Sequence, residues 1–120
     1  MDNKHKTGQE GQAAAEKYLQ GKGYTILARN YRAKTGEVDL VVKDGAYIVF
    51  VEVKYRKSLK YGFPREAVGH AKQQRIVSTA LHYLATHRLT ESDIRFDVVE
   101  VLEQHGRLYA SHIQDAFMAT

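Results

Sequence analysis

The sequence predicts an α/β domain in which a central mixed sheet is flanked by helices. Two segments place apolar residues at helical spacing, and five segments are rich in the β-branched and aromatic residues of strands. Their order is helix, three strands, helix and two strands, a pattern of mixed α/β folds. Neither an internal repeat nor a Pro/Gly-rich linker divides the chain, so we expect a single domain over residues 1–120.

The first helix and the first three strands occupy the N-terminal half. A stripe of Ala, Tyr and Leu residues at helical spacing predicts a helix from Gly8 to Gly21, where "GKG" ends it. The segment Tyr24–Tyr31 has strand composition. Gly36–Arg56 then contains two Val-rich strands around a tight turn, which predicts a hairpin.

The C-terminal half repeats the pattern with one helix and two strands. An apolar stripe between Ile76 and Ala85 predicts an amphipathic helix over about Gly69 to His87. The segments Arg95–Val101 and Arg107–Ile113 are strand-like and flank a glycine-containing turn.

Composition excludes several classes of protein. The chain has no cysteine, which removes disulfides, thiolate metal sites and cysteine nucleophiles, and fits a reducing compartment. The opening residues lack the apolar segment of a signal peptide, and the longest apolar run, Ala46–Val51, is too short to cross a bilayer. We therefore expect a cytoplasmic protein without a membrane partner. The net charge of +4 favours a polyanionic partner, most simply nucleic acid.

The hairpin carries acidic and basic residues inside its strands, where such residues are depleted. The Asp44-Gly45 pair favours a two-residue type I′ turn, which places Glu37 opposite Glu52 and Asp39 diagonal to Glu52. Alternation then divides the hairpin into two faces. The charged face holds Glu37, Asp39, Glu52 and Lys54, and the apolar face holds Val38, Leu40, Val42, Val49, Val51 and Val53.

Asp39, Glu52 and Lys54 form a pattern with a chemical interpretation. Two carboxylates on rigid strands suit Mg²⁺, which binds one or two carboxylates and completes its shell with water and phosphate oxygens. A lysine on the same face can orient the bound water and stabilise the negative charge that grows on phosphorus. This predicts a phosphodiester hydrolysis site. The alternative is the ordinary solvated face of an antiparallel hairpin, because an acid-x-Lys pattern is short and frequent.

Several segments together resemble a known family. "GEVDLV", "VFVEVKYR", "YGFPREAV", "KQQRIVSTALHYL" and "RFDVVEV" resemble the YraN-like family of small bacterial proteins, which are regarded as predicted endonucleases. That family belongs to the restriction-endonuclease-like PD-(D/E)xK superfamily and is similar to archaeal Holliday-junction resolvases. The resemblance extends from Gly8 to Phe117 and implies a core of α-β-β-β-α-β order.

The resemblance also implies roles for individual residues. Asp39 and Glu52 would be ligands of Mg²⁺ or Mn²⁺, the backbone carbonyl of Val53 a further ligand, and Lys54 the catalytic lysine. The family usually carries an acid in the first helix that reaches toward the metal. Here the matching residue is Gln12, whose amide oxygen can coordinate but brings no charge. Glu16, on the same helix face, is a possible substitute, and an ordinary surface acid is the alternative.

Further residues are accessory candidates. Glu37 faces Glu52 in the predicted register, where two like charges repel unless a cation or a basic group lies between them. Gln73 lies at the start of the second helix, where side chains and backbone N–H groups can meet a phosphate. The residues expected to contact nucleic acid are Arg32, Arg56, Lys57, Lys72 and Arg75. A solvated rim is the alternative for these positions.

Three functions compete on this sequence. The first is a Mg²⁺-dependent DNA endonuclease, with branched or otherwise structured DNA as a candidate substrate. The second is a DNA-binding module on a nuclease fold whose catalysis is weak or lost, and Gln12 is its chief support. The third is a small protein-interaction module with a charged hairpin. Cutting both strands of DNA symmetrically would call for a homodimer, because one site serves one strand.

Overall fold

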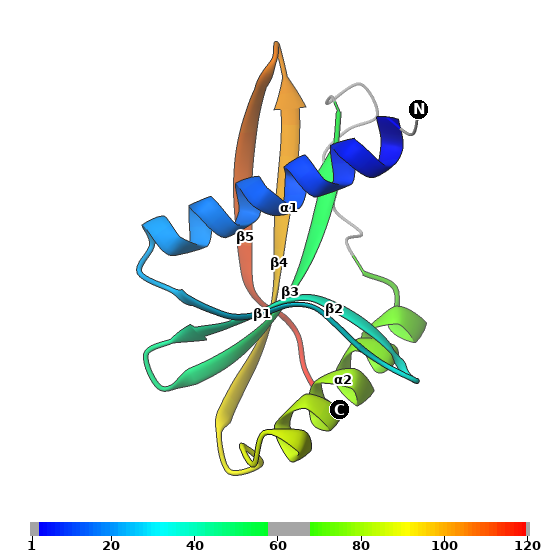
Figure 1. Ribbon diagram of the computed structural model, residues 1–120, viewed down its shortest axis with the longest axis vertical. Helices are drawn as coiled ribbons and strands as arrows, with labels where there is room; N and C mark the ends of the chain where they lie inside the picture. Colours follow the sequence, from blue (N-terminus) through cyan, green and yellow to red (C-terminus); the bar gives the residue numbers. More distant parts are fainter. Residues whose placement is uncertain (1–2, 58–67, 120) are drawn as a thin grey trace.

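The computed structural model describes residues 3–57 and 68–119, and it has the predicted order of helices and strands (Figure 1). The elements are α1 (Asn3–Gly21), β1 (Thr25–Ala33), β2 (Gly36–Asp44), β3 (Tyr47–Arg56), α2 (His70–Thr86), β4 (Asp93–Gln104) and β5 (Arg107–Phe117). Pro64, in the segment between β3 and α2, lies outside the described residues.

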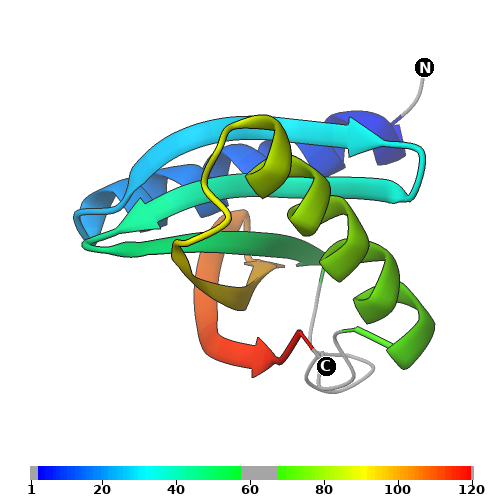
Figure 2. The same cartoon turned by 90° about the horizontal axis from the view of Figure 1, so that it is seen from below.

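The five strands form one twisted mixed sheet of order β1-β2-β3-β4-β5. Strands β3 and β4 are parallel, and every other neighbouring pair is antiparallel. A parallel pair needs a long crossover, and α2 lies within that crossover. Figure 2 shows α1 behind the strands and α2 in front of them, so the two helices cover opposite faces of the sheet. This confirms a mixed α/β fold with a sheet flanked by helices.

Each helix buries its own apolar cluster against the sheet. The cluster under α1 contains Ala15 and Leu19, which pack against Leu40, Val51 and other valines of the central strands. The cluster under α2 is more aromatic. Its buried members are Val38, Val41, Ile48, Phe50, Ile76, Ala80, Tyr83, Leu84 and Phe96. Strands β2 and β3 contribute to both clusters, so they are buried on both faces and read as nearly continuous hydrophobic runs.

The predicted limits of α2 agree with the structure at both ends. Gly69 precedes the first helical residue as an extended N-cap, and His87 follows the last one as the C-cap. The first helix begins at Asn3, before the predicted start at Gly8. The prediction missed its opening residues because they are polar and add nothing to the apolar stripe. None of the helices described in the structure is long and apolar enough to span a membrane.

The hairpin turn differs from the prediction. Asp44 pairs with Tyr47, so the two loop residues are Gly45 and Ala46 rather than Asp44 and Gly45. Gly45 has a φ of 59°, which matches a type II′ turn with glycine at the first central position. The register therefore moves by two residues along one strand. An even shift leaves every side chain on its face, which is why the prediction of the charged face survives in part.

Val38 does not lie on the predicted apolar face. It packs under α2, whereas Leu40 and Val42 pack under α1. Simple alternation would put all three residues on one side of β2. The side-chain pattern of β2 therefore changes between Val38 and Leu40, and the residue at this change is Asp39.

Candidate functional site

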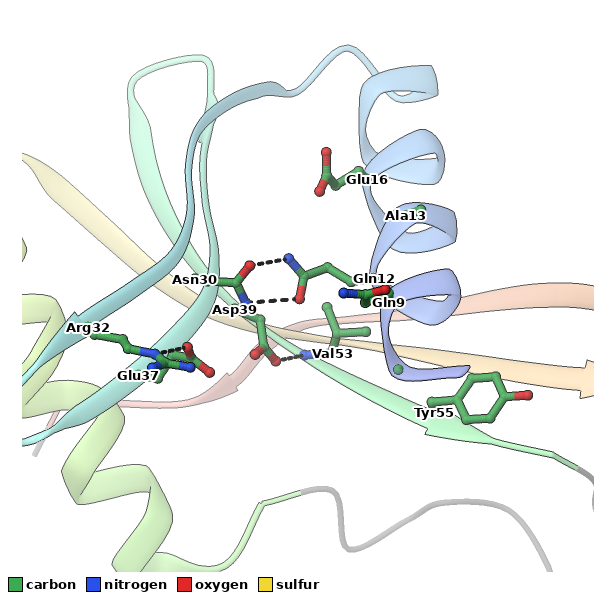
Figure 3. A pocket seen from close by; sticks show the side chains of 11 residues that line it. Gln9, Gln12, Ala13, Glu16, Asn30, Arg32, Glu37, Asp39, Val53 and Tyr55 are labelled. Atoms are coloured by element: carbon green, nitrogen blue, oxygen red, sulfur yellow. Dashed lines mark hydrogen bonds and ion pairs between the residues drawn. The ribbon is translucent and has the colours of Figure 1, made fainter. Parts of the chain in front are cut away.

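Asp39 lies where β2 and β3 separate. The ladder between these strands runs from the turn as far as Leu40 and Val51, and beyond it the Asp39 side chain takes the place of a backbone partner. The backbone N–H of Val53 donates to Asp39 Oδ2 at 2.8 Å (Figure 3). This hydrogen bond fixes the Asp39 carboxylate at the edge of the gap between the two strands.

The second acid of the predicted pair is close to the first. Glu52 lies on β3, its side chain is 7% exposed, and its carboxyl group interacts with that of Asp39. Burial and the negative charge of Glu52 raise the pKa of Asp39 to about 7, although the hydrogen bond from Val53 opposes this change. The structure thus brings the two predicted carboxyl groups together, and two negative charges at this place repel each other.

Lys72 supplies the positive charge nearest to this pair. It extends from the first turn of α2, and its ammonium forms an ion pair with Glu52 Oε2. The space around this contact is a small cavity of about 170 Å³. Its lining residues are Gly36, Glu37, Asp39, Glu52, Lys72, Arg75 and Ile76. The sequence indicated Lys72 and Arg75 as phosphate contacts, and the structure places both beside the acids.

A larger cleft of about 800 Å³ opens on the other side of Asp39, between α1 and the strands (Figure 3). Gln9, Gln12 and Glu16 line it from α1, so this stripe of the helix faces the same cleft as Asp39. Glu16 is already neutralised, because Arg29 Nε donates to its carboxylate at 2.8 Å. Asp39 lines both cavities, so it lies between the cleft under α1 and the cavity under α2.

Gln12 is held by a residue that sequence reasoning did not single out. Its amide forms two hydrogen bonds with the amide of Asn30, at 3.0 and 3.2 Å, as the dashed lines in Figure 3 show. Asn30 has a φ of 50° within β1, a left-handed conformation that Asn tolerates better than most residues. The pairs on either side of it place Asn30 opposite Asp39 in the ladder. An Asn inside a predicted strand was the available signal.

Glu37 is not opposite Glu52. The register pairs it with Arg32 of β1, and Arg32 Nε donates to its carboxylate at 2.7 Å. The expected repulsion between Glu37 and Glu52 is therefore wrong, because the shifted turn and the neighbouring strand provide a different partner. Arg32 remains 80% exposed at the rim of the large cleft, where it is available to a ligand.

Lys54 lies on β3 beside a buried acid of β4. Its register partner is Glu100. Burial raises the pKa of Glu100 above its ordinary value, and the positive charges of Arg56 and Lys54 offset this only in part. Within the described residues, Glu100 Oε1 is buried and has no hydrogen-bond partner. Alternation puts Lys54 on the same face of β3 as Glu52, as the sequence predicted. Its ammonium acts electrostatically on Glu100.

The remaining predicted residues have simpler positions. Gln73 donates to the backbone carbonyl of Val68 at 3.0 Å and so fastens the start of α2. Lys57 is exposed just beyond the end of β3. Arg56, also at that end, acts electrostatically on Glu100. Gln73 therefore has a structural contact at the start of α2. Arg56 and Lys57 together make the C-terminal end of β3 basic.

A second buried polar cluster lies elsewhere in the sheet. Asp97 accepts hydrogen bonds from the side chains of Arg95 and His112 and from the backbone N–H of Asp115. Arg95 continues the network to Asp44 and Tyr24. Asp97, whose orientation the sequence leaves open, therefore does not join the Asp39 site.

Metal ligands are scarce by simple counting. The described part of the chain contains no group of three or more His, Cys, Asp or Glu side chains placed to hold a metal ion. Asp39 and Glu52 offer two carboxyl groups, and the other carboxylates that line the two cavities, Glu16 and Glu37, are paired with Arg29 and Arg32.

Comparison with other proteins gives a family. Residues 11–101 match the model described as Uncharacterised protein family UPF0102. A UPF0102 protein of Lachnoclostridium phytofermentans is 48% identical over 118 residues, which cover 98% of this chain and 97% of the relative. A UPF0102 protein of Syntrophus aciditrophicus is 47% identical over 117 residues, or 98% of this chain and 92% of the relative.

Similarity to solved structures is weak. The crystal structure of SSO0001 aligns with a TM-score of 0.40 and 17% identity, over 93% of this chain and 52% of that chain. The family match covers residues 11–101 and the two relatives cover nearly the whole chain, and the chain belongs to the UPF0102 family.

Proposed function

We propose that this chain is a Mg²⁺- or Mn²⁺-dependent DNA endonuclease on a restriction-endonuclease-like core. The observation that carries the proposal is the buried pair of Asp39 and Glu52, whose carboxyl groups meet at a gap in the sheet. The order α1-β1-β2-β3-α2-β4 supports it, because it is the order that the resemblance to the PD-(D/E)xK superfamily implies. The net charge of +4 agrees with a nucleic acid as substrate.

The acidic pair has the chemistry of a site for a hard divalent cation. Burial and mutual repulsion raise the pKa of Asp39, and a positive charge between the two carboxylates would remove that penalty. Asp39, Glu52 and the carbonyl of Val53 would hold the ion, and two carboxylates are enough for Mg²⁺. When bound, the ion would lower the pKa of a water molecule and stabilise negative charge on the phosphate.

The other residues would position substrate and water. Lys54, on the same strand face as Glu52, would orient the attacking water and stabilise the charge that develops on phosphorus. Arg32 at the rim of the cleft, with Arg56 and Lys57 at the end of β3, would hold the DNA backbone. Branched or otherwise structured DNA is the substrate class that the resemblance to junction resolvases suggests.

A DNA-binding module with weak or lost catalysis is the second candidate. Its support is the neutral amide at Gln12, which is engaged by Asn30 and brings no charge to the cleft. Glu16 is a poor substitute for a carboxylate at position 12, because its own carboxylate is paired with Arg29.

A nuclease panel with matched variants tests the proposal. Single-stranded, duplex, flap and four-way DNA are incubated with Mg²⁺ or Mn²⁺ and with wild-type protein, Asp39→Asn, Glu52→Gln or Lys54→Ala. We expect cleavage by the wild type and by the control, none by Asp39→Asn or Glu52→Gln, and a loss of about 100-fold or more in Lys54→Ala, which keeps its Mn²⁺ affinity. Glu91→Gln, at an exposed turn, is the control.

Two outcomes decide between the candidates. Cleavage that persists in Asp39→Asn and Glu52→Gln would contradict the site. Salt-dependent DNA binding by the wild type without cleavage on any substrate would support the DNA-binding module instead.

A further inference from the structure

Lys72 occupies the place that a cation would need. Its ammonium contacts Glu52 Oε2 inside the small cavity that Asp39 and Glu52 share. A Mg²⁺ ion that takes Glu52 as a ligand would lie about 2.0–2.1 Å from its carboxylate oxygen. The ammonium and the ion therefore compete for Glu52.

The two ends of this ion pair differ in freedom. The Glu52 side chain is 7% exposed and fixed within the sheet, whereas the Lys72 side chain is 45% exposed. A lysine carries a compact charge on a flexible four-carbon chain, so it can leave one partner and turn toward solvent at small cost. The carboxylate is the fixed part of the contact, and the ammonium is the part that can move.

The helix that carries Lys72 is anchored independently of the ion pair. The hydroxyl groups of Thr79 on α2 and Thr35, just before β2, are hydrogen-bonded at 2.7 Å, and Gly36 of β2 approaches α2 closely. A Cβ built on Gly36 would lie 3.5 Å from Thr79 Oγ1 and 3.6 Å from Arg75 Cβ. Release of Glu52 therefore needs only a rotation of the Lys72 side chain, with no shift of α2.

From these contacts we propose that Lys72 is an internal counter-ion of the Asp39–Glu52 pair, which a divalent cation displaces. In the metal-free protein the ammonium neutralises Glu52. When the cation binds, Lys72 is released beside the occupied site, where its charge becomes available to a phosphate of the substrate. Metal binding and phosphate binding are thus coupled through one side chain. The proposal rests on the metal site of the proposed function.

Calorimetric titration with Mn²⁺ tests this exchange with three proteins that differ at one position. Lys72→Met removes the competing charge and keeps an unbranched side chain, so we expect Mn²⁺ to bind about fivefold to tenfold more tightly than in the wild type. Lys72→Arg keeps the charge and can hold a carboxylate through two hydrogen bonds, so we expect weaker binding than in the wild type. Arg75→Gln is the control, because Arg75 lines the same cavity and forms no ion pair among the described residues.

Thermal unfolding provides a second readout. Without metal, Lys72→Met should unfold at a lower temperature than the wild type, because Glu52 loses its counter-ion, and saturating Mn²⁺ should raise its midpoint more than that of the wild type. If Lys72→Met cannot be purified folded, the weaker binding of Lys72→Arg still tests the competition.

The possible failures are distinct. Equal or weaker Mn²⁺ binding by Lys72→Met, or unchanged binding by Lys72→Arg, would overturn the exchange and leave the metal site intact. A wild-type protein that binds no Mn²⁺ would overturn both the exchange and the metal site of the proposed function.

Discussion

Asp39 and Asp97 are acids in the same sheet with opposite surroundings. Burial would raise the pKa of Asp97, but the hydrogen bonds from His112 and Arg95 outweigh it and hold that pKa below its ordinary value. Asp39 has one backbone donor and a second carboxyl group beside it, and its pKa is raised to about 7. The Asp97 cluster is complete in the protein alone, whereas the Asp39 site is not.

The difference separates a structural network from a candidate active site. Asp97 joins β4 to β5 through His112 and, by way of Arg95, reaches Asp44 at the hairpin turn. Every donor in that chain has an acceptor within the fold. At Asp39 the fold places like charges together, Lys72 pairs with Glu52 alone, and a cleft stays open, an arrangement that costs stability unless a further positive charge binds. Paired substitutions can measure this contrast.

The largest expected effect is on stability. Asp97→Asn removes the more buried of the two carboxylates that pair with Arg95, whose side chain is 8% exposed, and Asp44 remains, so we expect a loss of about 3 kcal/mol in the free energy of unfolding. Asp39→Asn keeps an acceptor for the Val53 N–H and removes a repelled charge, so metal-free stability should be unchanged or higher. Urea denaturation in a chelator at neutral pH measures both.

These two variants carry the same chemical change and serve as each other's control. Equal destabilisation by Asp39→Asn and Asp97→Asn would show that both carboxylates are ordinary structural acids, and the contrast would be wrong.

The second effect is a pH dependence that belongs to Asp39. Its pKa is raised from 3.8 to about 7 in the folded protein, so between these values the folded state holds a proton that the unfolded state has lost. Metal-free stability should therefore fall by up to a few kcal/mol as the pH rises from about 4 to about 7, and stay level above that. Urea midpoints measured across this range should slope downward in the wild type.

Asp39→Asn should flatten that slope, since Asn does not titrate. Asp97 contributes with the opposite sign, because its lowered pKa gives stability that is lost only as the pH falls below about 4. A slope that persists unchanged in Asp39→Asn would assign it to another group.

Local patterns in the sequence were sufficient for the elements and for the principal acids. Apolar periodicity located α2 between Gly69 and His87, and alternation put Asp39 and Glu52 near each other. The prediction of the turn residues was wrong because Asp44-Gly45 and Gly45-Ala46 both satisfy the local rules for tight turns, and tertiary packing selects between them. The acidic pair survived this error because a shift of two residues preserves the faces.

What could not be predicted depends on contacts between distant segments. The left-handed conformation of Asn30, opposite Asp39, interrupts the alternation of side chains along β1. The apolar pattern of the sequence gives no sign of this interruption. The ion pair of Lys72 with Glu52 requires the position of α2 over the sheet, which periodicity does not give. The metal and catalytic roles proposed for Asp39, Glu52 and Lys54 rest on the chemistry of that pattern and on the family resemblance.

A smaller effect is expected from restoring the missing acid. Gln12→Glu puts a charged oxygen into the cleft and can still accept the hydrogen bond from Asn30. Mn²⁺ should bind about tenfold more tightly, or about 1.4 kcal/mol, and cleavage should rise or appear. Calorimetry beside a cleavage assay measures both. Glu16→Gln is the counter-test, and its silence together with a silent Gln12→Glu would mean that α1 does not complete the site.

The smallest effect concerns which of the two polar regions faces DNA. Lys57 lies at the end of β3 on the side of the Asp39 site, whereas Lys22 lies 3.4 Å from His112 Nδ1, beside the Asp97 cluster. Each phosphate contact that is lost lowers the salt dependence of DNA affinity by about one unit of slope. Lys57→Gln should therefore flatten the plot of log affinity against log salt, while Lys22→Gln leaves it unchanged.

Arg32→Gln should act like Lys57→Gln but less strongly, because the carboxylate of Glu37 already neutralises part of the Arg32 charge. Fluorescence anisotropy with labelled DNA over a salt series measures the slopes. The same slope for all three variants would mean that DNA does not choose between the two regions, and flattening by Lys22→Gln alone would move the DNA to the Asp97 side of the sheet.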